Sequence, residues 1–441
     1  MTTLTAMPKY EAYKDSGVEW IGEIPIHWEL KKLKFISFIN KQSLPENTSR
    51  NLTLEYVDIG SVTLEKGIEK VESFSFSDAP SRARRMANEG DTVVSTVRTY
   101  LKAIAYVDDI SSKYIYSTGF AVITPKCLKF SKYLTSFIKS DAFTKQVDDV
   151  AKGMSYPAIN STDLSNLFIA EPPESEHISI ANFLDEKIAK IDEAITIKEK
   201  QIELLKERKQ IIIQQAVTQG LDPTVPMKDS GVEWIGQIPA HWEMKPLKLH
   251  LKKIIDNRGR TPAFGDNGIP MLEVKNITDG DLYPTEQFDK FVIPSVVEKY
   301  ERDKVAIGDV LISTVGATSG KTVLIKNSPT YFICQNVVGL RPDIDLGSEF
   351  LNYTLSAVYF KTSLQMINKG NTIDNLKVSV FINNTIVMPP LQEQEKIAAH
   401  IELESRKTNN AIDILINQIN KLKEYKTTLI NSAVTGKIKV V

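Results

Sequence analysis

In two long segments of the chain, mostly apolar residues recur at alternating steps of four and three. This spacing places them in a stripe along one face of a helix and is typical of a helix that packs through that face. The first stripe runs through Leu184, Ile188, Ile191, Ile195, Lys198, Ile202, Leu205, Lys209, Ile212 and Ala216. The second follows the same steps from Ile401 to Ala433. Each apolar stripe must pack against another element, and the simplest packing partner for each helix is the other helix. The pattern therefore predicts two long antiparallel helices that form a coiled coil and act as a rigid spacer.

Outside these helices, apolar residues form short runs bounded by Gly, Pro, Asn and Asp. The β-branched runs 91–97, 120–124, 309–315 and 322–326 are typical of strands. Helical segments such as 132–146 lie between them. This interleaving predicts mixed α/β (α+β) domains without fixing the strand order.

A 15-residue box occurs twice, at Asp15–Glu29 and Asp229–Glu243, with 229 − 15 = 214 and two differences. The pair Lys152-Gly153 returns as Lys369-Gly370, and Pro172-Pro173 as Pro389-Pro390, both with a shift of 217. A repeat of half the chain predicts an internal duplication of a domain plus its connector. We expect a first domain at 1–173, a first helix at 174–217, a second domain at 218–390 and a second helix at 391–441.

Composition restricts the class of protein. The chain has 441 residues, of which 42% are hydrophobic and 25% charged, and its net charge is −1. These values are typical of a globular protein, and no apolar run approaches the ~20 residues of a membrane span, so we expect no membrane contact and a cytoplasmic location. Any nucleic-acid contact must rest on local basic patches or on the charge of a partner. We expect Cys127 and Cys334 to be buried free thiols, since their spacing does not match the repeat.

Three motifs resemble enzyme signatures without matching them. Gly316–Thr322 has three residues between its glycines where a phosphate loop has four. Asp266 with Glu273 and Lys275 resembles a metal-dependent nuclease cluster, but the first copy has no such lysine. The Pro-Pro pairs lack the aromatic residue that follows in adenine methyltransferases. We therefore predict no catalytic residue, no metal site and no cofactor bound by this chain. A methyltransferase or nuclease fused to its own DNA reader is the alternative function, and a coiled-coil scaffold without DNA function is a third.

Several basic and amide residues are candidates for DNA binding because arginine forks and lysines contact base edges and phosphates. Many lie where the two copies differ, and we expect Arg82, Arg84 and Arg85 to occupy a turn before Gly90. The candidates are Arg82, Arg84, Arg85, Arg98, Lys102, Arg258, Arg260, Lys275, Asn276 and Lys321.

All the tryptophans of the chain lie in the two boxes: Trp20, Trp28, Trp234 and Trp242. Packing inside the domain is one interpretation of these residues. Docking of a partner subunit is the other, because aromatic side chains are good interface anchors.

The doubled box, the Pro-Pro pairs and the two long helices together resemble the specificity subunit of type I restriction-modification systems. The segments Asn257–Pro262 and Gly308–Ser313 are also similar to the target-recognition domains of that family. The resemblance covers the chain from about Tyr13 to Lys439.

The resemblance implies that each variable domain reads one half of a bipartite, asymmetric target in double-stranded DNA, while the helices set the spacer. It also implies two modification (methyltransferase) subunits and motor-nuclease (restriction) subunits as partners. Those partners would bind S-adenosylmethionine, ATP and Mg²⁺, and would supply adenine methylation and DNA cleavage.

Overall fold

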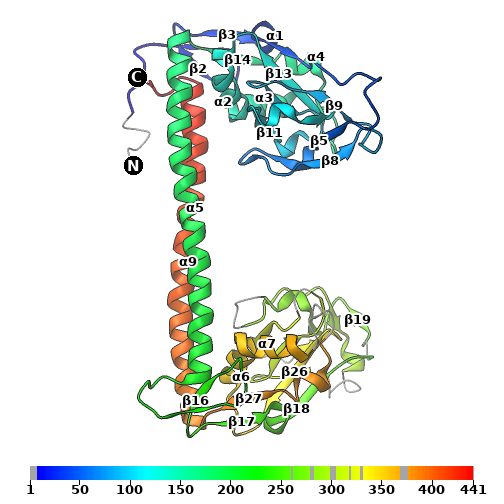
Figure 1. Cartoon of the computed structure of the whole chain (residues 1–441), viewed down its shortest axis with the longest axis vertical. Coiled ribbons are helices and arrows are strands. Elements are labelled where there is room, and N and C mark those ends of the chain that lie inside the picture. Colours follow the sequence, from blue (N-terminus) through cyan, green and yellow to red (C-terminus); the bar gives the residue numbers. More distant parts are fainter. Residues whose placement is uncertain are drawn as a thin grey trace. The chain divides into compact units, whose positions relative to one another are not determined.

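The computed structural model describes residues 7–259, 262–278, 283–297, 304–316, 319–327, 331–367 and 376–440. Its elements divide into two compact units (Figure 1). Unit 1 contains Met1–Lys198 and Asn417–Val441, and unit 2 contains Glu199–Ile416. Each unit therefore contains one globular part together with a stretch of both long helices.

The globular part of unit 1 contains two four-stranded sheets. The first has the order β11-β10-β13-β4, with bounds Ile104–Tyr106, Thr92–Ser95, Phe120–Pro125 and Ser37–Ile39. The second has the order β8-β5-β12-β9, with bounds Glu72–Ser75, Thr53–Val57, Ile115–Ser117 and Ala83–Met86. Strands β5 and β12 are parallel, and the other pairs in these sheets are antiparallel.

Unit 2 repeats this architecture. One sheet has the order β18-β26-β23-β24, with bounds Leu251–Asp256, Val337–Pro342, Val310–Ser313 and Thr322–Leu324. The other has the order β19-β21-β20-β25-β22, with bounds Phe264–Gly265, Phe291–Val292, Ile269–Leu272, Tyr331–Ile333 and Lys304–Val305. Here β20 and β25 form the parallel pair. The mixed α/β prediction is confirmed, as are the four predicted strands, which correspond to β10, β13, β23 and β24.

Short elements complete both globular parts. The helices are α1 (Leu33–Ile36), α2 (Ser131–Lys139), α3 (Asp141–Val150), α4 (Ser161–Ser165), α6 (Ser348–Ser356), α7 (Val358–Ile367) and α8 (Val378–Phe381). The two-stranded pairs are β1 (Tyr13–Asp15) with β2 (Glu23–Pro25), β3 (Glu29–Lys32) with β14 (Phe168–Glu171), β6 (Val62–Thr63) with β7 (Gly67–Ile68), β15 (Met227–Asp229) with β16 (Gln237–Pro239), and β17 (Glu243–Pro246) with β27 (Thr385–Met388). The prediction of one helix over 132–146 is wrong, because Ser140 is extended (φ −77°, ψ 160°) and separates α2 from α3.

Burial in the core explains why these strands are continuous runs of apolar, often β-branched residues in the sequence. Every residue of β10 and of β23 is buried, so neither strand needs a polar face. Complete burial of a valine or isoleucine side chain contributes about 1.5–3 kcal/mol. Both cysteines are free thiols, but Cys127 is exposed, so the prediction of burial is wrong for it. Burial does raise the pKa of the Cys334 thiol.

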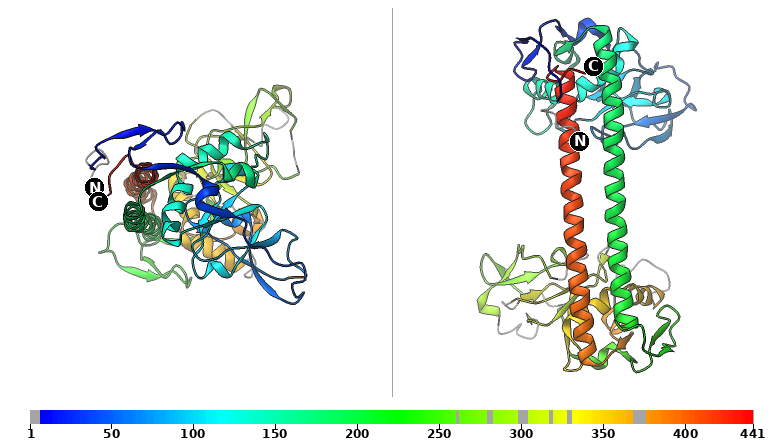
Figure 2. Two further views of the ribbon diagram at one scale, coloured as in Figure 1. Left: turned by 90° about the horizontal axis from the view of Figure 1, so that it is seen from above. Right: turned by 90° about the vertical axis from the view of Figure 1, so that its left-hand side faces the viewer.

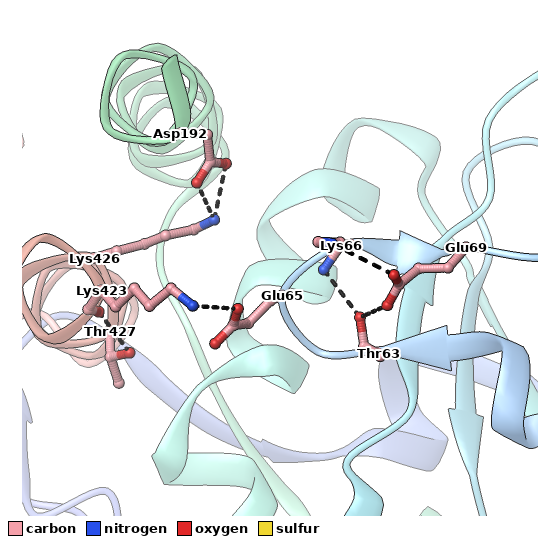
Figure 3. Close-up of polar contacts among 8 residues, drawn as sticks. All are labelled: Thr63, Glu65, Lys66, Glu69, Asp192, Lys423, Lys426 and Thr427. Atoms are coloured by element: carbon pink, nitrogen blue, oxygen red, sulfur yellow. Dashed lines mark hydrogen bonds and ion pairs between the residues drawn. The ribbon is translucent and has the colours of Figure 1, made fainter. Parts of the chain in front are cut away.

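The long helices are α5 (Glu174–Gln219) and α9 (Leu391–Val434), and the two lie side by side within each unit (Figure 2). In unit 1, Lys426 donates to Asp192 at 2.7 Å (Figure 3). In the same unit, Lys198 donates to Gln418 at 2.6 Å. In unit 2, Lys209 donates to Asn409 at 3.1 Å. In unit 1 the contacts move down α9 as they move up α5, so the two helices run in opposite directions there.

Helix α9 ends at Val434, short of the predicted boundary at 441. Gly436 takes a left-handed conformation (φ +72°), which stops a helix at low cost for glycine. Beyond it, the Lys439 amide donates to the Pro8 carbonyl at 2.7 Å. The two ends of the described chain are therefore hydrogen-bonded within unit 1.

Candidate nucleic-acid interface

Each tryptophan box is fixed to the start of a long helix by one carboxylate. Trp28 Nε1 donates to Glu176 at 2.9 Å, and the His27 ring bonds the other oxygen of the same carboxylate at 2.6 Å. In unit 2, Trp242 Nε1 and the His241 ring bond Glu393 in the same way, at 2.9 and 2.8 Å. We call these two groups the box clamps. Neither carboxylate was predicted from the sequence, although each lies three residues after a Pro-Pro pair.

The clamp of unit 1 has one additional donor, the Tyr10 hydroxyl, at 2.8 Å from Glu176. Burial acts to raise the pKa of Glu176, but hydrogen bonds from Trp28, Tyr10 and His27 outweigh it and hold the pKa below its ordinary value. Glu176 is therefore an ionised acceptor at neutral pH, and hydrogen bonds to ionised acceptors are the stronger kind.

The boxes also receive the far end of the other helix. A Cβ at Gly436 would lie 3.2 Å from the Trp28 ring, and one at Gly220 would lie 3.1 Å from the Trp242 ring. Both glycines have positive φ. Each box thus contacts the start of one long helix and the end of the other, inside its own unit.

The four tryptophan side chains differ in how deeply they are buried. Trp28 and Trp242 are fully buried and offer no surface to a partner. Trp20 is half-buried; its Nε1 donates to Asp149, and the Lys145 ammonium lies 4.9 Å from the ring centroid. Trp234 is 40% exposed. Partner docking stays a prediction for Trp20 and Trp234, whereas the packing interpretation describes Trp28 and Trp242.

Two arginines of the first cluster lie on a strand instead of the predicted turn, whereas Arg82 lies in a turn as predicted. Arg84 and Arg85 belong to β9, which pairs with β12, and Arg82 precedes them on the surface. The Arg84 guanidinium lies 4.7 Å from the Phe76 ring centroid. Arg85 is half-buried, its guanidinium donates one long hydrogen bond of 3.5 Å to Ser43, and its Nε has no partner among the described residues. Burial lowers the pKa of Arg85. Arg85 therefore keeps donor capacity that its surroundings do not use.

Arg98 and Lys102 flank a 3-10 turn between β10 and β11. Both adopt positive φ, 52° and 47°, which is costly for side chains of this size and typical of functional loops. The Arg98 guanidinium lies 5.4 Å from the Tyr156 ring centroid. Lys102 is 4.0 Å from Asp141.

A second loop packs beside this turn, because the Thr99 amide donates to the Pro157 carbonyl at 3.2 Å. Together the loops expose Tyr100 (56%), Tyr156 (67%) and Met154 (102%). We call the segments 97–102 and 152–157 the two-loop patch. Its apolar members were not predicted from the sequence, in which the repeated Lys-Gly pair at 152–153 is the signal nearest to them.

In unit 2, Arg258 forms an ion pair with Asp256, the last residue of strand β18. Its guanidinium donates three hydrogen bonds of 2.7 to 3.1 Å to Asp256. Burial acts to raise the pKa of Asp256, but hydrogen bonds from Arg258 bring it below its ordinary value. Arg260 lies outside the described residues. A DNA contact by Arg258 would have to compete with this ion pair.

Lys275 and Asn276 follow β20 at the predicted strand end, but they differ in accessibility. Asn276 is fully buried; its oxygen accepts from the Glu273 amide at 2.8 Å, and its nitrogen donates to the Thr285 and Gln287 carbonyls. It shapes the loop and offers no surface to DNA. Lys275 is paired with Asp289 and lies 3.6 Å from Glu273, which also accepts from Lys290 at 2.5 Å.

Lys321 precedes β24 in the hairpin with β23 and lines a cleft beside the long helices of unit 2. Within the described ranges, no three His, Cys, Asp or Glu side chains are grouped so that they could hold a metal ion. No described helix is long and apolar enough to cross a membrane.

The type I restriction modification DNA specificity domain matches this chain twice, over residues 25–207 and 241–424. The chain belongs to this family. Specificity subunits are the DNA-recognition components of type I restriction-modification systems, and they assemble with other subunits. Each match includes a globular part, its box clamp and most of the following long helix.

Relatives of this specificity subunit span most of its length. The MjaVIII specificity subunit of Methanocaldococcus jannaschii is 26% identical over 70% of this chain and 69% of its own. The putative MjaX specificity subunit of the same organism is 24% identical over the whole of both chains. A chain in a solved type I R-M system is similar in fold, with a TM-score of 0.72 at 22% identity, covering 93% of this chain and 98% of that one. The HsdS subunit of Thermoanaerobacter tengcongensis has a TM-score of 0.51 at 23% identity, covering 94% and 98%.

The two recognition domains of this specificity subunit therefore share a frame and differ in their loops. The box clamps recur in both units, and so do the four-stranded sheet and the parallel strand pair of the second sheet, which has one more strand in unit 2. The turn from Arg98 to Lys102 contains no glycine, whereas the corresponding hairpin in unit 2 contains Gly316 and Gly320.

Proposed function

We propose that each recognition domain reads one half of a bipartite, asymmetric target in double-stranded DNA. The observation that carries this proposal is the double match to the specificity domain, combined with loops that differ between the two copies. A shared frame with different loops is the arrangement expected for two readers of different sequences. Each good bidentate contact in the major groove contributes about 1–3 kcal/mol of discrimination, so two readers multiply their selectivity.

Within unit 1, the observed geometry favours Arg85 and the two-loop patch as the reading elements. Arg85 retains unused donors, and the patch presents Arg98 beside exposed aromatic and thioether groups. Arginine and apolar side chains of this kind contact base edges and unstacked base steps. Lys102, Lys275 and Lys321 are suited to phosphates, which position a protein on DNA without reading its sequence.

We assign the spacer and the docking of two modification subunits to α5 and α9, paired as an antiparallel coiled coil. Beyond the seam, unit 2 exposes Leu204 (53%) and Ile211 (49%) on α5, seven residues apart and so on one face of that helix. It also exposes Leu403 (52%) and Ile414 (57%) on α9. Exposed apolar residues at helical spacing suit the helices of a partner.

This subunit would contribute no catalytic residue. S-adenosylmethionine, ATP and Mg²⁺ are assigned to the modification subunits and to the motor-nuclease subunits. The domain limits 1–173, 174–217, 218–390 and 391–441 describe this division into reader, spacer, reader and spacer.

The test compares two sets of substitutions in the full chain, co-expressed with its modification subunits in a host whose genomic methylation is sequenced. One set changes Arg82, Arg84 and Arg85 to Ala, and the other changes Arg258 and Arg260 to Ala. Each set is expected to relax or abolish recognition of one half-site and serves as the control for the other. Equal effects of either set on both half-sites would contradict separate readers.

A further inference from the structure

The contact between α5 and α9 differs in charge between the two units. Asp192 and Asn409 are equivalent positions, because 409 − 192 = 217 is the repeat shift, and so are Lys426 and Lys209, because 426 − 209 = 217. In unit 1 Lys426 donates to the Asp192 carboxylate at 2.7 Å, whereas in unit 2 Lys209 donates to the Asn409 amide oxygen at 3.1 Å. At this position the second copy keeps a cross-helix hydrogen bond and has an amide in place of the carboxylate.

The neighbouring position changes in the same direction. Glu193 of the first copy corresponds to Asn410 of the second, again with a shift of 217. Two carboxylates in one unit are therefore two amides in the other. Both changes make this part of unit 2 more positive.

In unit 2 these amides line a cleft of about 430 Å³ between the globular part and the long helices. Its described lining includes four cations, Lys209, Lys321, Lys361 and Arg406, and one carboxylate, Glu402. Arg406 donates to Glu402 at 3.2 Å, so that carboxylate already has a cationic partner. The volume lies within the range of small-molecule sites, about 300–1,000 Å³.

The corresponding region of unit 1 is neutralised by its own side chains (Figure 3). Lys426 contacts Asp192, and Lys423 reaches Glu65 of the β6–β7 hairpin at 3.0 Å. Lys139 lies near the first pair, and burial together with the charge of Lys426 lowers its pKa. Of these carboxylates, Asp192 is replaced by an amide, Asn409, in unit 2.

The cleft of unit 2 also contains a buried amide side chain, that of Asn352. Asn352 lines it at 3% exposure, and its side-chain oxygen has no hydrogen-bond partner among the described residues. Buried polar atoms without a partner are rare, so each one calls for a physical explanation. Since the unpartnered atom is an acceptor, it suits a ligand that carries a hydrogen-bond donor, such as a hydroxyl or N–H group, in addition to a negative charge.

We propose that this cleft of unit 2 binds a phosphate ester, carried either by the DNA backbone or by a free nucleotide. Lysine ammoniums supply the charge, and the amides of Asn409 and Asn410 can donate to phosphate oxygens without repelling them. Only the DNA source rests on the proposed function. The missing carboxylates at positions 409 and 410 are the feature that distinguishes this cleft from its counterpart in unit 1.

The test restores the charge pattern of unit 1. Asn409→Asp places a carboxylate beside Lys209, and the Asp192–Lys426 pair shows that such a contact fits between these helices. Gln418→Glu is the matched control, since it makes the same change beside a cross-helix lysine, Lys198, without lining the cleft. Lys321→Gln provides a second variant should Asn409→Asp fail to fold. All are made in the full chain bound to its modification subunits.

Two measurements distinguish the sources of phosphate. Equilibrium dialysis with adenosine monophosphate measures free-nucleotide binding, and we expect Asn409→Asp to weaken it about tenfold. Duplex binding across a salt series measures backbone contacts, and loss of one contact should make the slope of log K against log[salt] shallower by about 0.9. A change in either measurement for Asn409→Asp or Lys321→Gln, but not for Gln418→Glu, supports the cleft and identifies its ligand.

The proposal is overturned if neither adenosine monophosphate binding nor the salt slope responds to Asn409→Asp and Lys321→Gln. That result is distinct from failure of the proposed function. The latter would appear in the unaltered complex, as methylation without any bipartite sequence preference.

Discussion

Replacing Glu176 with Ala tests the box clamp, and the second copy supplies the comparison. Glu176 accepts three hydrogen bonds, from Tyr10, His27 and Trp28, at 2.8, 2.6 and 2.9 Å. Glu393 accepts two, from His241 and Trp242. Truncation leaves a fully buried indole N–H without an acceptor in both units. We therefore expect both variants to open locally more often, with unit 1 affected more.

The difference between the two variants follows from the additional donor. A hydrogen bond to a charged group contributes about 1.5–3 kcal/mol, and a stranded buried donor costs about 1–3 kcal/mol. The loss at Glu176→Ala should exceed that at Glu393→Ala by about one such bond. At 1.4 kcal/mol per factor of ten, this predicts local opening roughly 10- to 150-fold more frequent in unit 1 than the matched change produces in unit 2.

Hydrogen exchange read by mass spectrometry resolves the two units, because it reports local opening for each peptide. Peptides that contain β2 and β16 are the matched reporters. Glu174→Ala is the control, since Glu174 lies in the same helical turn but pairs on the surface with Lys129; it should leave β2 protection nearly unchanged. Equal acceleration at β2 and β16, or a larger effect in unit 2, would refute the argument that donor number sets the strength of the clamp.

Three further outcomes are expected. Hydrogen bonds hold the pKa of Glu176 below the ordinary value of 4.5, so the stabilisation that Glu176 provides is present above pH 4.5 and is lost as pH falls through the lower folded-state pKa. Hydrogen exchange of β2, measured across a pH series, should show this loss, and Glu176→Gln should remove the pH dependence. Inserting four residues after Lys200 adds about 6 Å of helix, and methylome sequencing should show both half-sites retained with a spacer one or two base pairs longer; an active variant with the original spacing would disprove a ruler. Met154→Ala and Tyr156→Ala should weaken methylation of one half-site without lowering the thermal midpoint, because both side chains are exposed; an unchanged half-site would remove the two-loop patch from the reading surface.

The sequence predicted the parts of this fold that depend on local pattern. The stripes of α5 and α9 and the runs of β10 and β23 are periodic signals, so no long-range information was needed. The predicted turn holds for Arg82 but is wrong for Arg84 and Arg85, because β9 is a short strand with two charged residues, which owes its place to pairing with β12. Local composition does not encode that pairing.

The contacts of the candidate site residues were harder to predict from the sequence, because they too depend on long-range pairing. The partner of Trp28 lies 148 residues away along the chain, at Glu176, and becomes visible only when the fold brings the two together. Asn276 has the composition of a surface contact and is fully buried by bonds to backbone groups that the sequence does not reveal. Asp256 lies two residues before Arg258, but spacing alone does not show that the two side chains bond each other.

The separation of frame from loops has a consequence for how target recognition can change. The clamp residues Trp28 and Trp242 are buried, and truncation of a buried aromatic side chain typically costs about 3–5 kcal/mol. Met154, Tyr100 and Tyr156 are exposed, and substitutions at such positions usually change stability by less than about 0.5 kcal/mol. These exposed residues can therefore be exchanged without loss of the fold, while the clamp of each unit remains intact. Under the proposed function, such a specificity subunit would acquire a new half-site by altering loops alone, provided that the new loops close on the same strands.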